Sequence, residues 1–101
     1  MRERSLQVEQ WPITQLLPYA QNARTHSDEQ IEQIAASIAR SGFNQPILVN
    51  QHGVVIAGHG RLLAAQRLAM DKVPTIVLPD LTDTDERAYR LADNQLALNA
   101  G

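Results

Sequence analysis

Apolar residues recur along this chain with two spacings, one typical of strands and one typical of helices. Alternating or continuous apolar runs bounded by Pro, Gly or polar turn residues predict strands. These runs fall at residues 6–11, 47–50, 54–57 and 73–78. Only Gln-His-Gly separates the second run from the third, which predicts a tight hairpin. Residues 13–26 show no sustained period, and we expect an irregular segment there with one short turn at 14–17.

Helical spacing is clearest after Ser27, where the hydroxyl and Gln30 three residues later make a capping box. One apolar stripe follows, made of Ile31, Ile34, Ala35 and Ile38. Gly42 stands where a left-handed C-terminal cap is expected. Residues 61–70 are apolar on most sides, as in a helix packed against a sheet. A last helix is expected from about residue 85 to 92 or beyond, capped by Thr82 or Thr84.

The junction between the third strand and the helix after it carries the candidate chemistry. It reads Gly58-His59-Gly60-Arg61. A helix start leaves about four backbone N–H groups without intrahelical partners, so it attracts anions, and glycines let a phosphate approach closely. Arg61 can add a charge-assisted contact to phosphate oxygens. The alternative is a purely structural role, in which the two glycines make a turn and Arg61 is a solvated helix residue. The motif is neither a Walker A loop nor a dinucleotide fingerprint.

Composition narrows the function classes. The chain has 101 residues, 44% of them hydrophobic, which predicts a single domain spanning residues 1–101. The net charge of -2 argues against DNA binding through a positively charged protein surface as a whole. The absence of cysteine excludes thiolate chemistry, and the three histidines lack the spacing of zinc ligands, so no zinc is expected. No apolar run could span a membrane or serve as a secretory signal, so a cytoplasmic protein is expected. The apolar pattern continues to residue 101, which suggests the N-terminal part of a longer protein.

Taken together, the motifs Asn-Ala-Arg at 22–24, GFNQPI at 42–47, AGHGRLLAA at 57–65 and LADNQLAL at 91–98 resemble the N-terminal domain of ParB-type chromosome-partitioning proteins. The resemblance covers about residues 6–100. In particular, it resembles phage and prophage domains that precede a DNA methyltransferase. It implies an α+β fold shared with sulfiredoxin, with a small mixed sheet, and a site for CTP or ATP with Mg²⁺. DNA would be bound mainly by other parts of the polypeptide, and a homodimer is compatible with the resemblance.

Within the junction, Gly58 and Arg61 match the ends of the ParB motif Gly-Glu-Arg-Arg, while His59 and Gly60 replace its centre. In ParB that segment holds the phosphates of CTP, and the resemblance therefore implies that Gly58, His59, Gly60 and Arg61 bind phosphate. Sulfiredoxin has Gly-Cys-His-Arg there, and without cysteine sulfinic acid reduction is excluded. His59 has three readings: it hydrogen-bonds a phosphate, it acts as a base, or it merely covers the loop as a solvated side chain.

Other positions of the expected site come from the same resemblance. Gln45, with Pro46, matches a Gly-x-x-Gln-Pro segment bordering the nucleotide, and Arg24 matches a position on its base or phosphate side. Asp93 and Asn94 resemble a Glu-Asn pair beside the triphosphate and its Mg²⁺, which makes Asp93 the candidate metal ligand. The alternative is that Asp93-Asn94 only breaks or recaps the last helix.

Two further functions stay open at this stage. A metal-dependent ParB-like nuclease would need clustered carboxylates. The dense acidic run is Asp80, Asp83, Asp85 and Glu86, which falls at a helix start where acids are favoured anyway. A non-catalytic dimerisation or interaction domain would leave the glycine loop empty. Trp11 is expected to pack against the core rather than to stack on bases. No complete catalytic constellation for an NTPase or a nuclease is apparent in the sequence.

Overall fold

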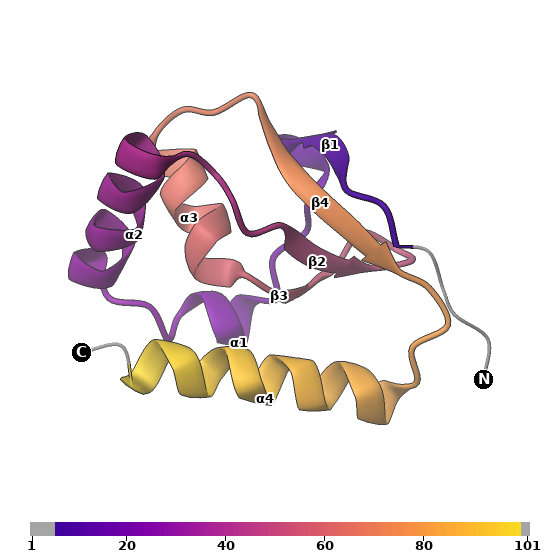
Figure 1. Ribbon diagram of the computed structural model, residues 1–101. Coiled ribbons are helices and arrows are strands. Elements are labelled where there is room, and N and C mark those ends of the chain that lie inside the picture. Colours follow the sequence, from indigo (N-terminus) through magenta and orange to yellow (C-terminus); the bar gives the residue numbers. More distant parts are fainter. Residues whose placement is uncertain (1–5, 100–101) are drawn as a thin grey trace.

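A mixed sheet of four strands organises the chain (Figure 1), for which the computed structural model describes the backbone of residues 6–99 and the side chains of residues 6–95. The spatial order is β1 (Glu9–Pro12), β4 (Lys72–Leu78), β2 (Ile47–Asn50) and β3 (Val55–Ala57). Strand β4 is antiparallel to β1 and parallel to β2, and β2 and β3 form an antiparallel hairpin. The helices are α1 (Ala20–Ala23), α2 (Asp28–Ser41), α3 (His59–Arg67) and α4 (Asp83–Asn99), and a 3-10 helix, η1 (Ile13–Gln15), follows β1. The expected α+β class with a small mixed sheet is confirmed.

Helix α3 lies between the sheet and α2, which explains why its sequence is apolar on most sides. Its residues Leu62 and Ala65 belong to the main core. The sheet residues of that core are Ile47, Val49, Val55 and Val73. On its other side, Ala64 packs with Ile31 and Ala35 of α2. Because complete burial of a Leu, Ile or Val side chain is worth about 1.5–3 kcal/mol, this two-sided packing fixes the position of α3.

Helix α2 begins as its sequence predicts, and it ends at the expected Gly42, but the ψ angle of 167° shows that this residue is not the expected left-handed cap. The Ser27 hydroxyl accepts a hydrogen bond from the Gln30 amide, and the Gln30 side chain accepts one from the Ser27 amide, both at 3.1 Å. Gly42 follows the last turn with φ +86°, a conformation that glycine adopts without strain. These caps satisfy backbone groups that the helix itself cannot pair.

The hairpin is confirmed, and Asn50 organises its turn. The Asn50 side-chain oxygen accepts hydrogen bonds from the amides of His52 at 2.9 Å and Val54 at 3.0 Å. The Asn50 side-chain amide donates to Glu86 Oε1 at 3.1 Å, which ties the hairpin to α4.

Several boundaries differ from the sequence prediction. Strand β1 begins at Glu9 and includes Pro12, which is tolerated because β1 is an edge strand. Residues 13–26 contain η1 and α1 instead of one turn at 14–17. Helix α3 begins at His59, two residues before the expected start, because Gly58 in the left-handed conformation already serves as its N-cap.

Helix α4 runs without interruption from Asp83 to Asn99, so the alternative that Asp93 and Asn94 break the last helix is wrong. Thr82 caps it, since its hydroxyl accepts from the Asp85 amide and Asp85 Oδ2 accepts from the Thr82 amide, both at 3.1 Å. Figure 1 shows α4 crossing one end of the molecule, beside α1 and β3. The apolar pattern at 96–101 lies outside the residues whose side chains are described.

Candidate functional site

The strand–glycine–helix junction forms as the sequence indicates, with Gly58 between β3 and α3. Gly58 has φ +97°, and a Cβ atom there would lie 3.0 Å from Arg61 Nη2 and 3.4 Å from the Cα atom of Ile47. Glycine is therefore required for both backbone conformation and space. The result is a helix start whose first amides, those of Gly58 and His59, donate hydrogen bonds to Asp93 of α4.

His59 is completely buried beneath this junction, so the interpretation of a solvated loop histidine is wrong. Its Nε2 atom accepts a hydrogen bond from the Tyr19 amide at 3.0 Å, and its Nδ1 atom lies 2.7 Å from Asp93 Oδ2. Because a backbone amide only donates, Nε2 must be an acceptor, and in the neutral ring the proton is on Nδ1 and is donated to Asp93. The ring thus joins the segment before α1 to α3 and to α4.

Asp93 of α4 is the anion that meets the positive end of α3. Its Oδ1 accepts from the Gly58 amide at 3.1 Å, and its Oδ2 accepts from the His59 amide at 3.4 Å. The Asn22 side-chain amide donates to Oδ2 at 3.5 Å. Burial by itself would raise the pKa of Asp93, but the hydrogen bonds from the His59 side chain and the Gly58 amide outweigh it and lower that pKa to about 2. The carboxylate is therefore charged at neutral pH.

Arg61 projects from the first turn of α3 toward the segment that precedes β2. Its Nη1 donates to Gln45 Oε1 at 3.1 Å, and its Nη2 donates to the Pro46 carbonyl oxygen at 3.3 Å. Its Nε is buried and has no hydrogen-bond partner among the described residues. Burial lowers the pKa of Arg61, and the negative charge of Asp93 partly opposes this. The guanidinium group is thus held in place with unused donor capacity.

A cavity of about 330 Å³ opens between α2, the loop before β2 and the start of α3. Its lining residues are His26, Gln30, Gln33, Ile34, Ser37, Ile38, Gly42, Phe43, Asn44, Gln45, Gly58, Gly60, Arg61 and Asp93. One part of the wall is apolar, made by Ile34, Ile38 and Phe43, while amide side chains and Arg61 supply polar groups. This volume and this mixture are typical of sites for small organic ligands.

The structure brings together some of the expected site residues and separates others. Gln45, Gly58, Gly60, Arg61 and Asp93 line the cavity, whereas His59 is buried and does not line it. Gly60 also permits close packing of α3, because a Cβ atom there would lie 2.8 Å from the His26 ring and from Ile34 Cδ1.

Arg24 and Asn94 do not line this cavity. Arg24 is exposed at the C-terminal cap of α1. Asn94 lines a second cavity, between α1 and α4, and its side-chain oxygen accepts from Thr25 Oγ1 at 3.4 Å. Their assignment to a nucleotide site stays a prediction.

Sequence reasoning missed several residues of the site. His26, Gln30, Gln33 and Ser37 follow one another at helical spacing of three or four positions and all line the cavity. That polar stripe was the available signal. Asn22, buried at 1% exposure, was visible only as part of the Asn-Ala-Arg motif.

A metal site receives no geometric support in the described part of the chain. Within it, no group of three or more His, Asp or Glu side chains could hold a metal ion. Both oxygens of Asp93 already accept hydrogen bonds, so a Mg²⁺ role for Asp93 stays a prediction. Three residues of the acidic run, Asp83, Asp85 and Glu86, lie in the first turn of α4, and Asp80 precedes the helix. Glu86 pairs with Arg90 at 3.2 Å.

Comparison with known proteins gives the chain a family. Residues 2–95 match the ParB N-terminal domain. The chain is 51% identical over 76 residues to the ParB-like nuclease domain-containing protein YnaK of Escherichia coli K12, and the match covers 75% of this chain and 87% of that protein. It is 34% identical over 93 residues to the nucleoid occlusion protein of Bacillus thuringiensis strain Al Hakam, which covers 87% of this chain but 32% of that protein.

Solved structures agree with this relationship. The C-terminally truncated chromosome-partitioning protein ParB from Caulobacter crescentus, crystallised with CTP-γ-S, has a TM-score of 0.75 at 29% identity, covering 87% of this chain and 52% of that one. Sulfiredoxin from Arabidopsis thaliana shares the fold, with a TM-score of 0.68 at 17% identity, covering 82% of this chain and 96% of that one. Among the described residues, no helix is both long enough and apolar enough to cross a bilayer. The chain belongs to the family of ParB N-terminal domains.

Proposed function

We propose that this chain is the nucleotide-binding module of a longer ParB-type protein that acts on DNA. The observation that carries the proposal is the cavity beside the start of α3, with Arg61 on its wall. Arg61 would contact a phosphate group, because a guanidinium group with unused donors pairs well with phosphate oxygens. Gln45 would border the nucleotide and hold Arg61 at the same time.

CTP is the first nucleotide to test, because the Caulobacter ParB, whose match covers 87% of this chain, was crystallised with a CTP analogue. ATP is the second. Mg²⁺, when bound, would neutralise phosphate charge, and Asp93 is the carboxylate among the residues that line the cavity. It would have to exchange its hydrogen bonds to Gly58 and His59 for the metal.

Action on DNA is proposed from the family, and from the nucleoid occlusion and chromosome-partitioning relatives in particular. DNA contact is assigned to other parts of the full-length protein, since this chain carries a net charge of -2. The same proposal includes a DNA methyltransferase domain in the full-length protein and the formation of a homodimer. No observation favours the nuclease alternative, given the lack of a metal-binding cluster among residues 6–95.

Thermal unfolding tests the proposal. A nucleotide at about 100 times its dissociation constant stabilises the folded state by about 2.7 kcal/mol, which raises Tm by several degrees in a domain of this size. We expect such a rise with CTP or ATP in the presence of Mg²⁺, and its loss in Arg61→Ala. Arg67→Ala is the matched control, because Arg67 is on the same helix but pairs with Asp28 at 3.2 Å and does not line the cavity. An unchanged Tm of the wild type with every nucleotide would favour the interaction domain instead.

A further inference from the structure

His26, in the segment between α1 and α2, is a residue of the cavity wall whose ring is oriented by the backbone. Its Nδ1 atom lies 3.3 Å from the carbonyl oxygen of Asn22. Because a carbonyl oxygen only accepts hydrogen bonds, Nδ1 carries the proton of the neutral ring and Nε2 keeps a lone pair. The hydroxyl of Thr25 lies farther from Nδ1, at 3.5 Å, and donates to the same carbonyl oxygen at 2.7 Å. His26 is thus a hydrogen-bond acceptor at Nε2.

The Nε2 atom of His26 is available to a ligand. His26 lines the cavity, and Nε2 makes no hydrogen bond within the described part of the chain. It is not among the buried side-chain atoms without a partner, which are Nε of Arg61 and Nε of Arg90. An acceptor that is neither paired nor buried can be reached from the solvent. Gly60 leaves space beside it, since a Cβ atom there would lie 2.8 Å from Nε2.

The other polar side chains of the wall do not fix the direction of a hydrogen bond in this way. The amide and hydroxyl side chains donate or accept after a rotation. Arg61 only donates. Asp93 only accepts, but both of its oxygens already accept hydrogen bonds from the start of α3. The lone pair of His26 is therefore the side-chain feature of this wall that distinguishes a donor on the ligand from an acceptor.

A nucleotide base suits this part of the wall better than a phosphate group does. Ile34 Cδ1 also lies 2.8 Å from the position that a Gly60 Cβ atom would take, so an apolar group adjoins the acceptor. A base combines an apolar face with a polar edge, whereas phosphate oxygens would meet the Nε2 lone pair without a proton to donate. Cytosine and adenine carry an exocyclic amino group that donates. Uracil and hypoxanthine carry a carbonyl oxygen at that position, which accepts.

We infer that His26 selects the base of the bound nucleotide, because its Nε2 atom accepts a hydrogen bond from an exocyclic amino group. The inference rests on the proposed nucleotide binding and specifies a residue that recognises the base. The cavity then prefers cytosine or adenine to uracil or hypoxanthine. A carbonyl oxygen in place of the amino group would put two acceptors in contact and leave Nε2 without a partner. This weakens binding on the order of tenfold.

Titration calorimetry with two pairs of ligands tests the inference, with Mg²⁺ and at pH 8, at which imidazole rings are neutral. CTP and UTP form one pair, and ATP and inosine triphosphate form the other. In the pair that binds more tightly, we expect the nucleotide with the amino group to bind on the order of tenfold more tightly than its partner. Equal or reversed affinities in that pair overturn the inference and leave the proposed function standing. Failure of all four triphosphates to bind overturns the proposed function as well.

His26→Phe tests whether the ring nitrogen causes the preference. Phenylalanine keeps an aromatic ring but has no lone pair, so the amino-bearing nucleotide should lose on the order of tenfold in affinity while its partner changes little. The ratio between the two should approach one. A merely structural role would weaken both nucleotides equally and keep the ratio, which contradicts the inference. His52→Phe is the matched control, because His52 is exposed on the hairpin turn and does not line the cavity, and it should keep the full preference.

A ribose hydroxyl is the other donor that a nucleotide offers to Nε2. If His26→Phe weakens both ribonucleotides equally but leaves their 2′-deoxy forms unaffected, the donor is the hydroxyl and the inference about the base is wrong.

If the variant does not fold, an analogue with hydrogen in place of the amino group tests the wild type. This is zebularine triphosphate for cytidine and nebularine triphosphate for adenosine. It should bind between the two members of the pair, because it loses the hydrogen bond but brings no second acceptor. Any other order overturns the inference.

Discussion

Replacing Asp93 by Asn should weaken the pH dependence of the free energy of unfolding in acid, because the Asp93 carboxylate connects α4 to the start of α3. Asp93 accepts hydrogen bonds from the Gly58 amide, the His59 amide and the His59 ring. Asparagine keeps the shape but turns one acceptor oxygen into a donor group. That group would face donors, so at least one of these hydrogen bonds is lost.

The pKa of Asp93 gives the size of the effect. It falls from its usual value of 3.8 to about 2, nearly two pH units. At about 1.4 kcal/mol per pH unit, the ionised carboxylate contributes about 2 kcal/mol to the free energy of unfolding. Because the pKa is lowered in the folded state, this contribution is complete above the unfolded value near 4. It is lost as the pH falls through the window from about 4 to about 2.

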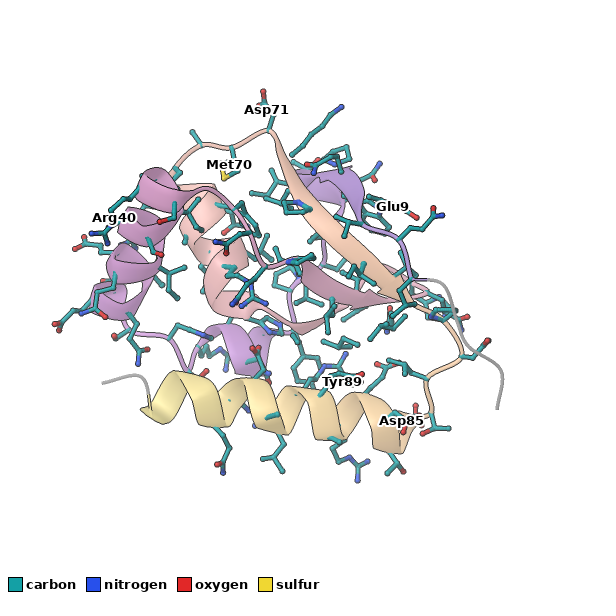
Figure 2. The ribbon with its side chains drawn as sticks, in the orientation of Figure 1. Glu9, Arg40, Met70, Asp71, Asp85 and Tyr89 are labelled. Carbon is teal, nitrogen blue, oxygen red and sulfur yellow. The ribbon has the colours of Figure 1, made fainter. Side chains whose placement is uncertain are left out.

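Urea unfolding of the wild type and of Asp93→Asn at pH 7, 5, 4, 3 and 2 measures this contribution. We expect the wild type to be more stable by about 2 kcal/mol at pH 7, and roughly half of this advantage to be gone near pH 3. Asp71→Asn is the matched control, because Asp71 points away from the body of the molecule before β4 (Figure 2) and its side chain is exposed. A constant difference between wild type and Asp93→Asn from pH 7 to pH 2 would refute the reasoning.

Two further substitutions distinguish effects on nucleotide binding from effects on the free energy of unfolding. Gly58→Ala should lower the free energy of unfolding by about 1–2 kcal/mol in urea unfolding, because φ is +97° and the new Cβ would lie 3.0 Å from Arg61 Nη2. It should also weaken nucleotide stabilisation, and unchanged Tm rises with nucleotide would contradict the close approach. Ser27→Ala should cost about 1 kcal/mol through loss of the capping box of α2. It should leave the nucleotide response intact, and a stability equal to that of the wild type would count against the cap.

Features that depend on neighbours along the chain were accessible from the sequence. Helix α2 was defined by a capping box and an apolar stripe, and both are present. The hairpin and β4 were defined by continuous apolar runs between turn residues. The strand–glycine–helix junction followed from the order of those elements and from Gly58. These features are local because backbone capping, turn geometry and side-chain periodicity act over a few residues.

What the sequence alone did not decide is how distant segments meet at the junction. His59 was expected to be a loop residue, yet it is buried and hydrogen-bonded to Asp93, 34 residues away. The direction of α4 across β3 and α1 determines that contact, and no local pattern encodes the direction (Figure 1). The same holds for the cavity, which forms only where α2 meets the loop before β2 and the start of α3. The sequence therefore determined which helices and strands form. Tertiary packing decided that the Asp93 carboxylate lies at the N-terminus of α3, because a charge interacts with a helix end only when the two are close in space.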